Sequence, residues 1–167
     1  MDANGEFVRN PGVDLVKVAV VERHQGTGNV ACGFLKGYGI KEGAVALSVA
    51  HDSHNIIVVG VNDEEMEFAV NSLIEQEGGI VLVKEGKVIE SMPMPIAGLM
   101  SDQSGEWVDQ KLTDIHEKAY EELGICGDVE PVMTLCFMSL AVIPEIKLTD
   151  MGLFDVTTFS FIPVEVE

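Results

Sequence analysis

Basic residues are scarce in this sequence. Ten lysines and arginines stand against 28 aspartates and glutamates, which gives a formal net charge of −18. A chain of this charge repels the phosphates of nucleic acids and of anionic membranes, so we expect neither as a partner. The acidic surface is most simply understood as one that favours solubility, with a specific basic partner as the alternative.

Cysteine is also rare, and long apolar runs are missing. Cys32, Cys126 and Cys136 are an odd number without CxxC spacing, which argues against a disulfide framework and suits a reducing compartment. No stretch reaches the 18 or so apolar residues that would predict a membrane-spanning helix. Residues 1–12 are polar, so no signal peptide is expected. We therefore expect a cytoplasmic protein.

Apolar residues are plentiful, although few are aromatic. Hydrophobic residues make up 47% of the 167 positions and aromatic residues 6%, so Val, Ile, Leu, Met and Ala must form most of the core. A chain of this length forms one domain whose core needs no covalent staple. We expect a linker or disordered N-terminus at residues 1–13, which include the turn sequence Asn10-Pro11-Gly12, and one domain at residues 14–167.

The order of apolar runs predicts an α+β, or mixed α/β, fold. Short apolar or alternating segments predict strands at 16–21, 30–35, 44–49, 55–61, 80–83, 88–92 and 159–166. The run at 55–61 is apolar throughout, which favours a strand buried on both faces. Residues 132–142 have no clear period, and their Met, Leu and Ala content favours a helix. We expect a mixed β-sheet covered by two or three helices.

Two other segments have the pattern of amphipathic helices. Asn62 suits an N-cap, the acidic residues at 63–65 suit the positive end of a helix dipole, and Glu65 occupies the capping-box position. An apolar stripe follows until Gly78-Gly79 ends the helix. The second helix is expected at about 104–123.

Reactive side chains are concentrated in one five-residue segment, His51-Asp52-Ser53-His54-Asn55. The segment lies between two predicted strands, where a sheet can hold functional side chains rigidly. Imidazole titrates near neutral pH and can transfer protons or bind metal, and Asp52 could orient either ring. The alternative is structural: these polar groups could bond to one another and to the loop backbone.

Two self-sufficient chemistries are disfavoured for this segment. A metal site needs three or four ligands, and only His24 and Asp52 suggest themselves besides the two histidines. A Ser53 nucleophile is disfavoured because triad members usually come from different elements, and the sequence has no G-x-S-x-G elbow.

A glycine-rich stretch, Gln25-Gly26-Thr27-Gly28-Asn29, lies shortly before this segment. It could cradle an anion, but it lacks the endings of the known phosphate-binding loops, so a plain turn is favoured. Arg23 and His24 come directly before it, at the end of the first predicted strand. A role for these two residues beside the histidine segment is possible.

Three strings resemble one known family. They are VAVVERHQGTGNVACGFLKGYGIKEGAVALSVAHDSHNIIVVG at residues 18–60, MPIAGLMSD at 94–102 and VIPEIKLTDMGLFD at 142–155. Together they resemble the C-terminal region of bacterial and archaeal adenine deaminases, and the similarity runs from about Val16 to the end. The HDSHN and IPEIKLTDMGLFD strings are its most specific parts.

The resemblance implies the hydrolysis of adenine to hypoxanthine and ammonia in purine salvage. Enzymes of that family belong to the amidohydrolase superfamily, and their divalent metal (manganese, iron or zinc) is held by a (β/α)₈ barrel that precedes this region. There the metal lowers the pKa of water so that hydroxide attacks C6 of adenine. This sequence has no barrel and too few histidines for a binuclear site, so we expect a fragment or a naturally truncated chain that is inactive alone.

Three roles remain open for the chain. In the first, the segment His51–Asn55, together with Arg23 and His24, faces the barrel of the same enzyme and helps to complete the adenine site. In the second, the chain is a dimerisation or structural module within a homo-oligomer and touches no substrate. In the third, it is a small independent metal-dependent hydrolase that uses His51, Asp52 and His54.

Overall fold

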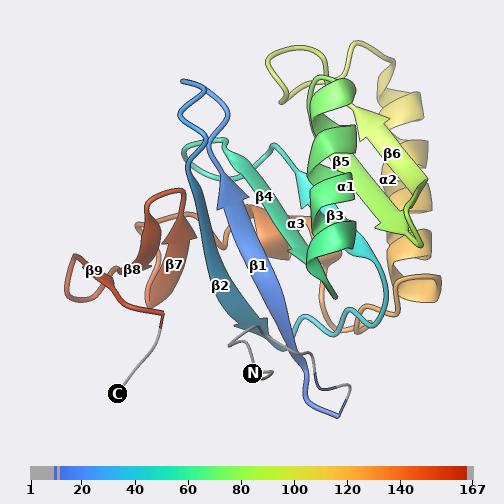
Figure 1. The fold of residues 1–167 in the computed structure, drawn as a ribbon. Coiled ribbons are helices and arrows are strands. Elements are labelled where there is room, and N and C mark those ends of the chain that lie inside the picture. The colour runs from blue at the N-terminus through green and yellow to red at the C-terminus, as the bar shows by residue number, and fades with distance from the viewer. Residues whose placement is uncertain (1–9, 11, 165–167) are drawn as a thin grey trace.

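A computed structural model describes residue 10 and residues 12–164, and Figure 1 shows their arrangement. The described strands are β1 (Leu15–Val21), β2 (Val30–Lys36), β3 (Ala44–Leu47), β4 (Ile56–Gly60), β5 (Gly79–Lys84), β6 (Lys87–Pro93), β7 (Ile146–Thr149), β8 (Gly152–Asp155) and β9 (Ser160–Ile162). The described helices are α1 (Asp63–Glu75), α2 (Gly105–Glu121) and α3 (Pro131–Cys136). The expected α+β class in a single domain is confirmed.

The main sheet has six strands in the order β2-β1-β4-β3-β5-β6, and a smaller sheet has the order β7-β8-β9. Every pairing in both sheets is antiparallel. The expectation of mixed strand directions is thus corrected. Neighbouring strands can run antiparallel here because β1 joins β2, and β5 joins β6, through short hairpin connections.

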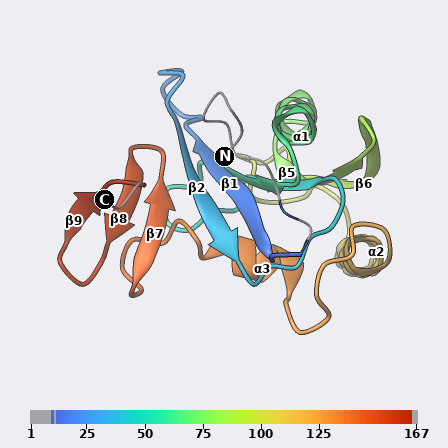
Figure 2. The same cartoon turned by 60° about the horizontal axis from the view of Figure 1, so that its bottom comes forward.

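Helices cover both faces of the main sheet. Figure 2 shows α1 on one side and α2 with α3 on the other. Met66, Ala69 and Leu73 of α1 are buried against inward-facing alanines and valines of the sheet. The opposite face forms the larger core cluster, to which Ile115 of α2 and Leu135 of α3 belong. Among the described helices, none is long and apolar enough to cross a membrane.

Strand β4 explains why one segment of the sequence is apolar without interruption. All five of its residues are buried, because β1 and β3 flank it and helices lie over both of its faces. Ile56 and Val58 belong to the cluster beneath α1, whereas Ile57 and Val59 belong to the cluster on the other face. The prediction of a doubly buried strand is confirmed, in an antiparallel sheet.

Helix α1 begins as predicted, but its capping box is only half formed. The side chain of Asn62 accepts a hydrogen bond from the backbone N–H of Glu65 at 2.8 Å. The side chain of Glu65 accepts from the backbone N–H of Gly86 (3.3 Å) in the β5–β6 turn. Glu65 therefore ties α1 to a hairpin.

The structure shortens two expected elements and adds a hairpin that was not expected, and some expected segments lie outside the described residues. Within residues 132–142 only the part up to Cys136 is helical, and turns follow. The hairpin of β7 and β8 was not predicted, although Leu148 and Leu153 on its inner face pack near Gly33 of β2. Of the expected tail strand at 159–166, only β9 is a strand; residues 159, 163 and 164 are not. Residues 165–167 lie outside the described part, as do residues 1–9 and 11 of the expected linker.

Candidate functional site

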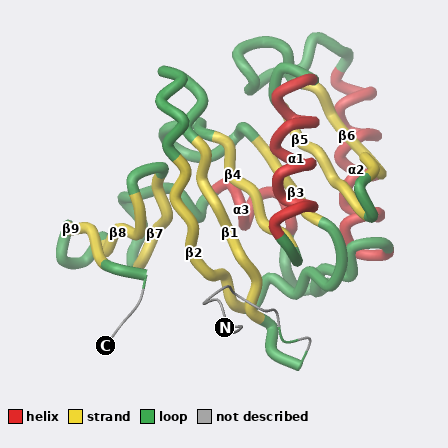
Figure 3. Tube along the Cα trace, viewed as in Figure 1, coloured by secondary structure: helices red, strands yellow, loops and turns green. Residues whose placement is uncertain are grey.

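The segment His51–Asn55 connects β3 to β4 at one end of the main sheet. Figure 3 shows the loops of residues 22–29, 48–55 and 94–104 gathered at that end. The chain reverses here because Leu47 and Ile56 end and begin neighbouring antiparallel strands. The sheet thus supplies a rigid base for the polar segment.

His51 is anchored by its backbone and by aromatic packing. Its N–H donates to the carbonyl of Cys136 (2.9 Å), and its carbonyl accepts from the hydroxyl of Ser139 (3.0 Å). Its ring lies 5.0 Å from that of Phe137 and 5.5 Å from that of His54, measured between centroids. The segment after α3 therefore fixes where the imidazole of His51 lies.

Asp52 and Ser53 form the exposed tip of the loop. His24 reaches this tip from the β1–β2 connection, and its Nε2 donates to the carbonyl of Ser53 at 2.7 Å. Because a carbonyl can only accept, this contact places a proton on Nε2 of His24. The exposed carboxylate of Asp52 remains at the surface beside the two histidines of its own loop.

His54 adopts a left-handed backbone conformation (φ 53°), which is uncommon for a residue with a side chain. Its Nδ1 is buried and has no hydrogen-bond partner among the described residues. Burial, with smaller contributions from the nearby His51 and Arg23, lowers the pKa of His54 below its ordinary value. A lowered pKa keeps the imidazole neutral near pH 7, so it can accept a proton.

Arg23 joins the site from the end of β1. Its backbone N–H donates to the side-chain oxygen of the buried Asn55 (3.3 Å), and its Nε donates to the carbonyl of His54 (2.5 Å). Its Nη2 donates to the carbonyl of Ala97 at 2.8 Å. Partial burial lowers the pKa of this guanidinium, which still stays charged. Arg23 and His24 therefore both contact the histidine segment, and their role beside it stays a prediction.

The glycine-rich loop does cradle an anion, but that anion is the carboxylate of Glu22. Backbone N–H groups of His24, Gln25 and Thr27 all donate to it, as does the hydroxyl of Thr27. These hydrogen bonds, led by the one from the Thr27 backbone, lower the pKa of Glu22 to about 2. The loop is therefore a turn organised around its own acidic residue.

The geometry gives little support to a metal site or a triad in this chain. Within the described part, no three His, Cys, Asp or Glu side chains come together as a metal site would require. The hydroxyl of Ser53 accepts from the backbone N–H of Asn55 (3.4 Å). What the arrangement offers is a neutral imidazole, an exposed carboxylate and a buried amide on a fixed frame.

Sequence reasoning missed several residues that shape this end of the molecule. Ala97 and Gly98 bring the turn at 94–102 against Arg23, and the buried hydroxyl of Ser48 donates to the carbonyl of Gly98 at 2.5 Å. Their contacts are made by backbone carbonyls, which residue types do not encode. Only the string MPIAGLMSD pointed to this turn.

Comparison with known proteins gives consistent findings. The family model described as "Adenine deaminase C-terminal domain" matches residues 1–160. "Adenine deaminase 2" of Desulfotalea psychrophila is 73% identical over 164 residues, and "Adenine deaminase" of Bacillus subtilis (strain 168) is 49% identical over 160 residues. These alignments cover 98% and 96% of this chain. The chain spans only 28% of the length of each relative.

Proposed function

Because the chain belongs to the adenine deaminase C-terminal domain family, we propose that it completes the active site of an adenine deaminase. The relatives are named as adenine deaminases. We infer that the intact enzyme hydrolyses adenine to hypoxanthine and ammonia. Most of each relative's length lies outside the stretch that matches this chain. In the proposed enzyme, the part that corresponds to the rest of the relatives' length supplies the chemical centre, and this chain alone is inactive.

One observation carries the proposal. At the end of the sheet, the backbone of the histidine segment is fixed by hydrogen bonds, while reactive side chains remain free to contact another molecule or domain. His51 and His54 are anchored through their backbone atoms, and Asp52 is exposed beside them. A loop whose only role was to tie strands together would direct its side chains to its own backbone. The hydroxyl of Ser53 does bond to the loop backbone, but the side chains of His51 and Asp52 lie at or near the surface, available to a partner.

The role of each group follows from its chemistry. Asp52 accepts hydrogen bonds and favours positive charge nearby, which suits an amino group or an imidazolium in the completed site. His54 is neutral near pH 7 and suits a proton acceptor or relay. Asn55 and His24 hold the loop in shape through Arg23 and Ser53. The metal implied for the enzyme does not fit the described residues, which bring together no set of ligands for it.

The test uses a full-length adenine deaminase that carries this sequence. His51→Ala and Asp52→Ala should each lower kcat for adenine by about 10- to 100-fold, because a group placed beside the reacting centre is lost. Asp128→Ala is the matched control: Asp128 is also exposed, in the loop that follows α2. Unchanged activity in both loop variants would sink the proposal.

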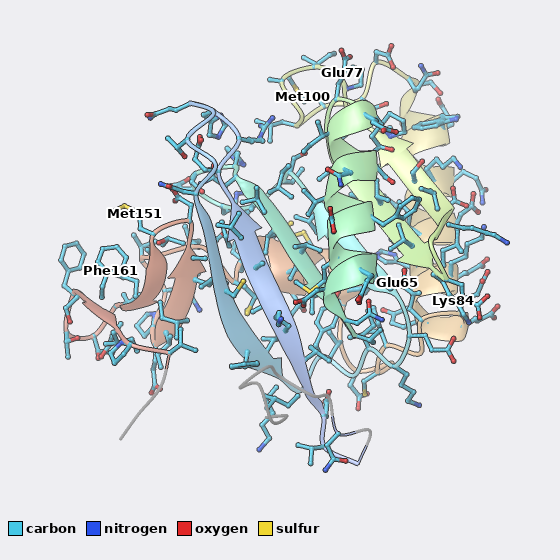
Figure 4. The ribbon with its side chains drawn as sticks, viewed as in Figure 1. Glu65, Glu77, Lys84, Met100, Met151 and Phe161 are labelled. Carbon is cyan, nitrogen blue, oxygen red and sulfur yellow. The ribbon has the colours of Figure 1, made fainter. Side chains whose placement is uncertain are left out.

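A second candidate, an assembly module, is favoured by the small sheet. Phe159 is 77% exposed and Phe161 is 52% exposed, and both pack against Phe154 with centroids 5.2 and 5.3 Å away. Figure 4 shows Phe161 and Met151 at the outer side of this sheet. Exposed aromatic clusters and outer strands are common contact surfaces between proteins.

Sedimentation tests the assembly candidate. If the small sheet joins two copies, this chain should sediment as a dimer at micromolar concentration, and Phe161→Ser should convert it to a monomer. Val88→Ser changes an exposed apolar residue on β6 and serves as the control. A monomer before any substitution counts against this candidate.

A further inference from the structure

The guanidinium of Arg23 connects two loops that lie far apart in the sequence. Its Nε donates to His54 in the β3–β4 loop, and its Nη2 donates to Ala97 in the turn after β6. Both acceptors are backbone carbonyls, so the two hydrogen bonds restrain the backbone of each loop and do not hold the side chains of His54 and Ala97. Lysine cannot reproduce this arrangement, since a single ammonium lacks the planar fork of donors.

The turn at Ala97 and Gly98 leaves space for this guanidinium. A Cβ on Gly98 would lie 2.6 Å from Nη1 of Arg23, so any other residue there would force the guanidinium to shift. Gly98 has φ +73°, and the neighbouring Ala97 has φ +59°, a left-handed conformation that costs energy for alanine. Strain of this kind persists where surrounding contacts impose it, and here Arg23 and Ser48 hold the turn from two sides.

The turn carries an apolar tip that the chain leaves uncovered. Ile96 and Met100 close the turn with two mutual backbone hydrogen bonds of 3.2 Å. Their side chains are 46% and 58% exposed. Figure 4 shows Met100 at the end of the molecule where α1 finishes, the same end as the histidine segment. A rigid apolar tip beside a polar loop suits a contact with another part of a protein.

We propose that Arg23 is a positioning residue that never meets the substrate, and that it locks the His51–Asn55 loop and the Ile96–Met100 turn into one face for the rest of the enzyme. This inference rests on the proposed function and adds to it the second loop and the role of the arginine. The occupant of the face is the remaining part of the same polypeptide, because the chain spans only 28% of each relative's length.

The contacts explain why Arg23 acts through His54. Two of its donors are already committed to carbonyls inside this chain, and its Nη1 lies against the backbone of Gly98. Losing the guanidinium would free the carbonyls of His54 and Ala97, and each of these two left-handed residues would lose one of the contacts that restrain it. His54 would then sample positions away from the reacting centre, which lowers the rate of the chemical step more than substrate affinity.

The test compares kcat with KM in a full-length adenine deaminase that carries this sequence. Arg23→Ala should lower kcat for adenine by about 10- to 100-fold and change KM by less than about twofold. The truncation leaves space beside a hollow of about 310 Å³ that Arg23 lines. Millimolar methylguanidinium should therefore restore part of the lost kcat, and it should not raise kcat in the His51→Ala variant.

The hydrogen bonds from Arg23 to His54 and Ala97 form a clasp between the two loops. A second substitution disturbs this clasp without removing the arginine. Gly98→Ala places a methyl group against the guanidinium and should lower kcat as Arg23→Ala does. Gly86→Ala is its matched control: Gly86 has φ +66°, but a Cβ there meets nothing within 4 Å. Both substitutions carry similar backbone strain, so a difference between them reports the contact with Arg23. This pair keeps the test decisive if Arg23→Ala fails to fold.

The outcomes separate this inference from the proposed function. A rise in KM with unchanged kcat would mean that Arg23 binds substrate, which overturns the positioning role. Unchanged kinetics in Arg23→Ala, or equal effects of Gly98→Ala and Gly86→Ala, overturn the clasp while His51→Ala and Asp52→Ala still report on the proposed function. If those two variants are fully active, the proposed function itself fails.

Discussion

At the scale of single residues, His54 makes a prediction about pH. Its pKa lies below the ordinary value of 6.5 because burial and, to a lesser degree, His51 and Arg23 disfavour the charged ring. We expect NMR titration of His54 to give a midpoint below that of the unfolded chain. Its contribution to stability is then fully present above pH 6.5 and is lost as pH falls through the folded pKa.

A matched variant identifies the cause of this shift. His51→Ala removes a neighbouring imidazole whose Coulombic interaction lowers the pKa of His54, so the titration of His54 should move part of the way back towards 6.5. A midpoint of His54 at or above the unfolded value would contradict the neutral imidazole that the proposed function assigns to it.

Glu22 makes a second residue-scale prediction. Glu22→Gln removes the charge that the backbone N–H groups of residues 24, 25 and 27 surround, so those amides should exchange with solvent faster. Because the folded pKa is about 2 and the ordinary value is 4.5, the loop's stabilisation is complete above pH 4.5 and is lost as pH falls towards 2. Glu75→Gln, on the exposed side of α1, should leave exchange in the loop unchanged.

At the scale of elements, the N-cap of α1 can be tested by equilibrium unfolding. Asn62→Ala removes the hydrogen bond to Glu65 and should lower the free energy of unfolding by about 1 kcal/mol. Asn71→Ala, in the interior of the same helix, should leave stability unchanged or raise it slightly, because alanine is the better helix former. Equal losses in the two variants would mean that the cap contributes nothing.

Methionine oxidation distinguishes the two surfaces that this chain exposes. Met100 on the Ile96–Met100 turn is 58% exposed, and Met151 beside the small sheet is 72% exposed. In the isolated chain both should be oxidised by peroxide at similar rates. In the full-length enzyme we expect Met100 to be protected and Met151 to stay reactive. Protection of Met151 alone would favour the small sheet as the contact surface.

Local sequence patterns predicted the elements whose formation depends on local chemistry. The uninterrupted apolar run gave β4, and the capping residue Asn62 with its acidic first turn gave α1. At 132–142 the Met, Leu and Ala content favoured a helix, and the helix α3 ends at Cys136, because turns follow that no residue pattern indicated. It also missed β7 and β8, which are four residues each and depend on packing against β2.

In the candidate site, too, the sequence indicated some residues, whereas other contacts follow only from the fold. Residue types singled out His51–Asn55, and the place of Arg23 and His24 at the end of the first strand suggested a role beside it. The role of Glu22 as the anion in the glycine-rich loop, and the link from Arg23 to Ala97, depend on backbone groups that only the fold brings together. A sequence lists side chains, and these contacts are made largely by main-chain atoms.

At the scale of the whole molecule, the acidic α+β domain is one part of a larger enzyme in the proposed function. Its sheet and helices form two complete core clusters, so the chain has the means to fold by itself. What it lacks within the described residues is a metal centre. Its reactive groups and its apolar tip lie at one end of the sheet, which is the end assigned to the rest of the polypeptide.

The most direct test is a structure of a full-length adenine deaminase that carries this sequence, determined with adenine or a close analogue bound. We predict that a side-chain atom of His51, Asp52, Ser53 or His54 lies within about 3.2 Å of the ligand, or one water molecule away from it. The Ile96–Met100 turn should be buried against the preceding part of the chain. A ligand site to which the His51–Asn55 loop contributes no atom, with that loop facing solvent, would contradict the proposed function.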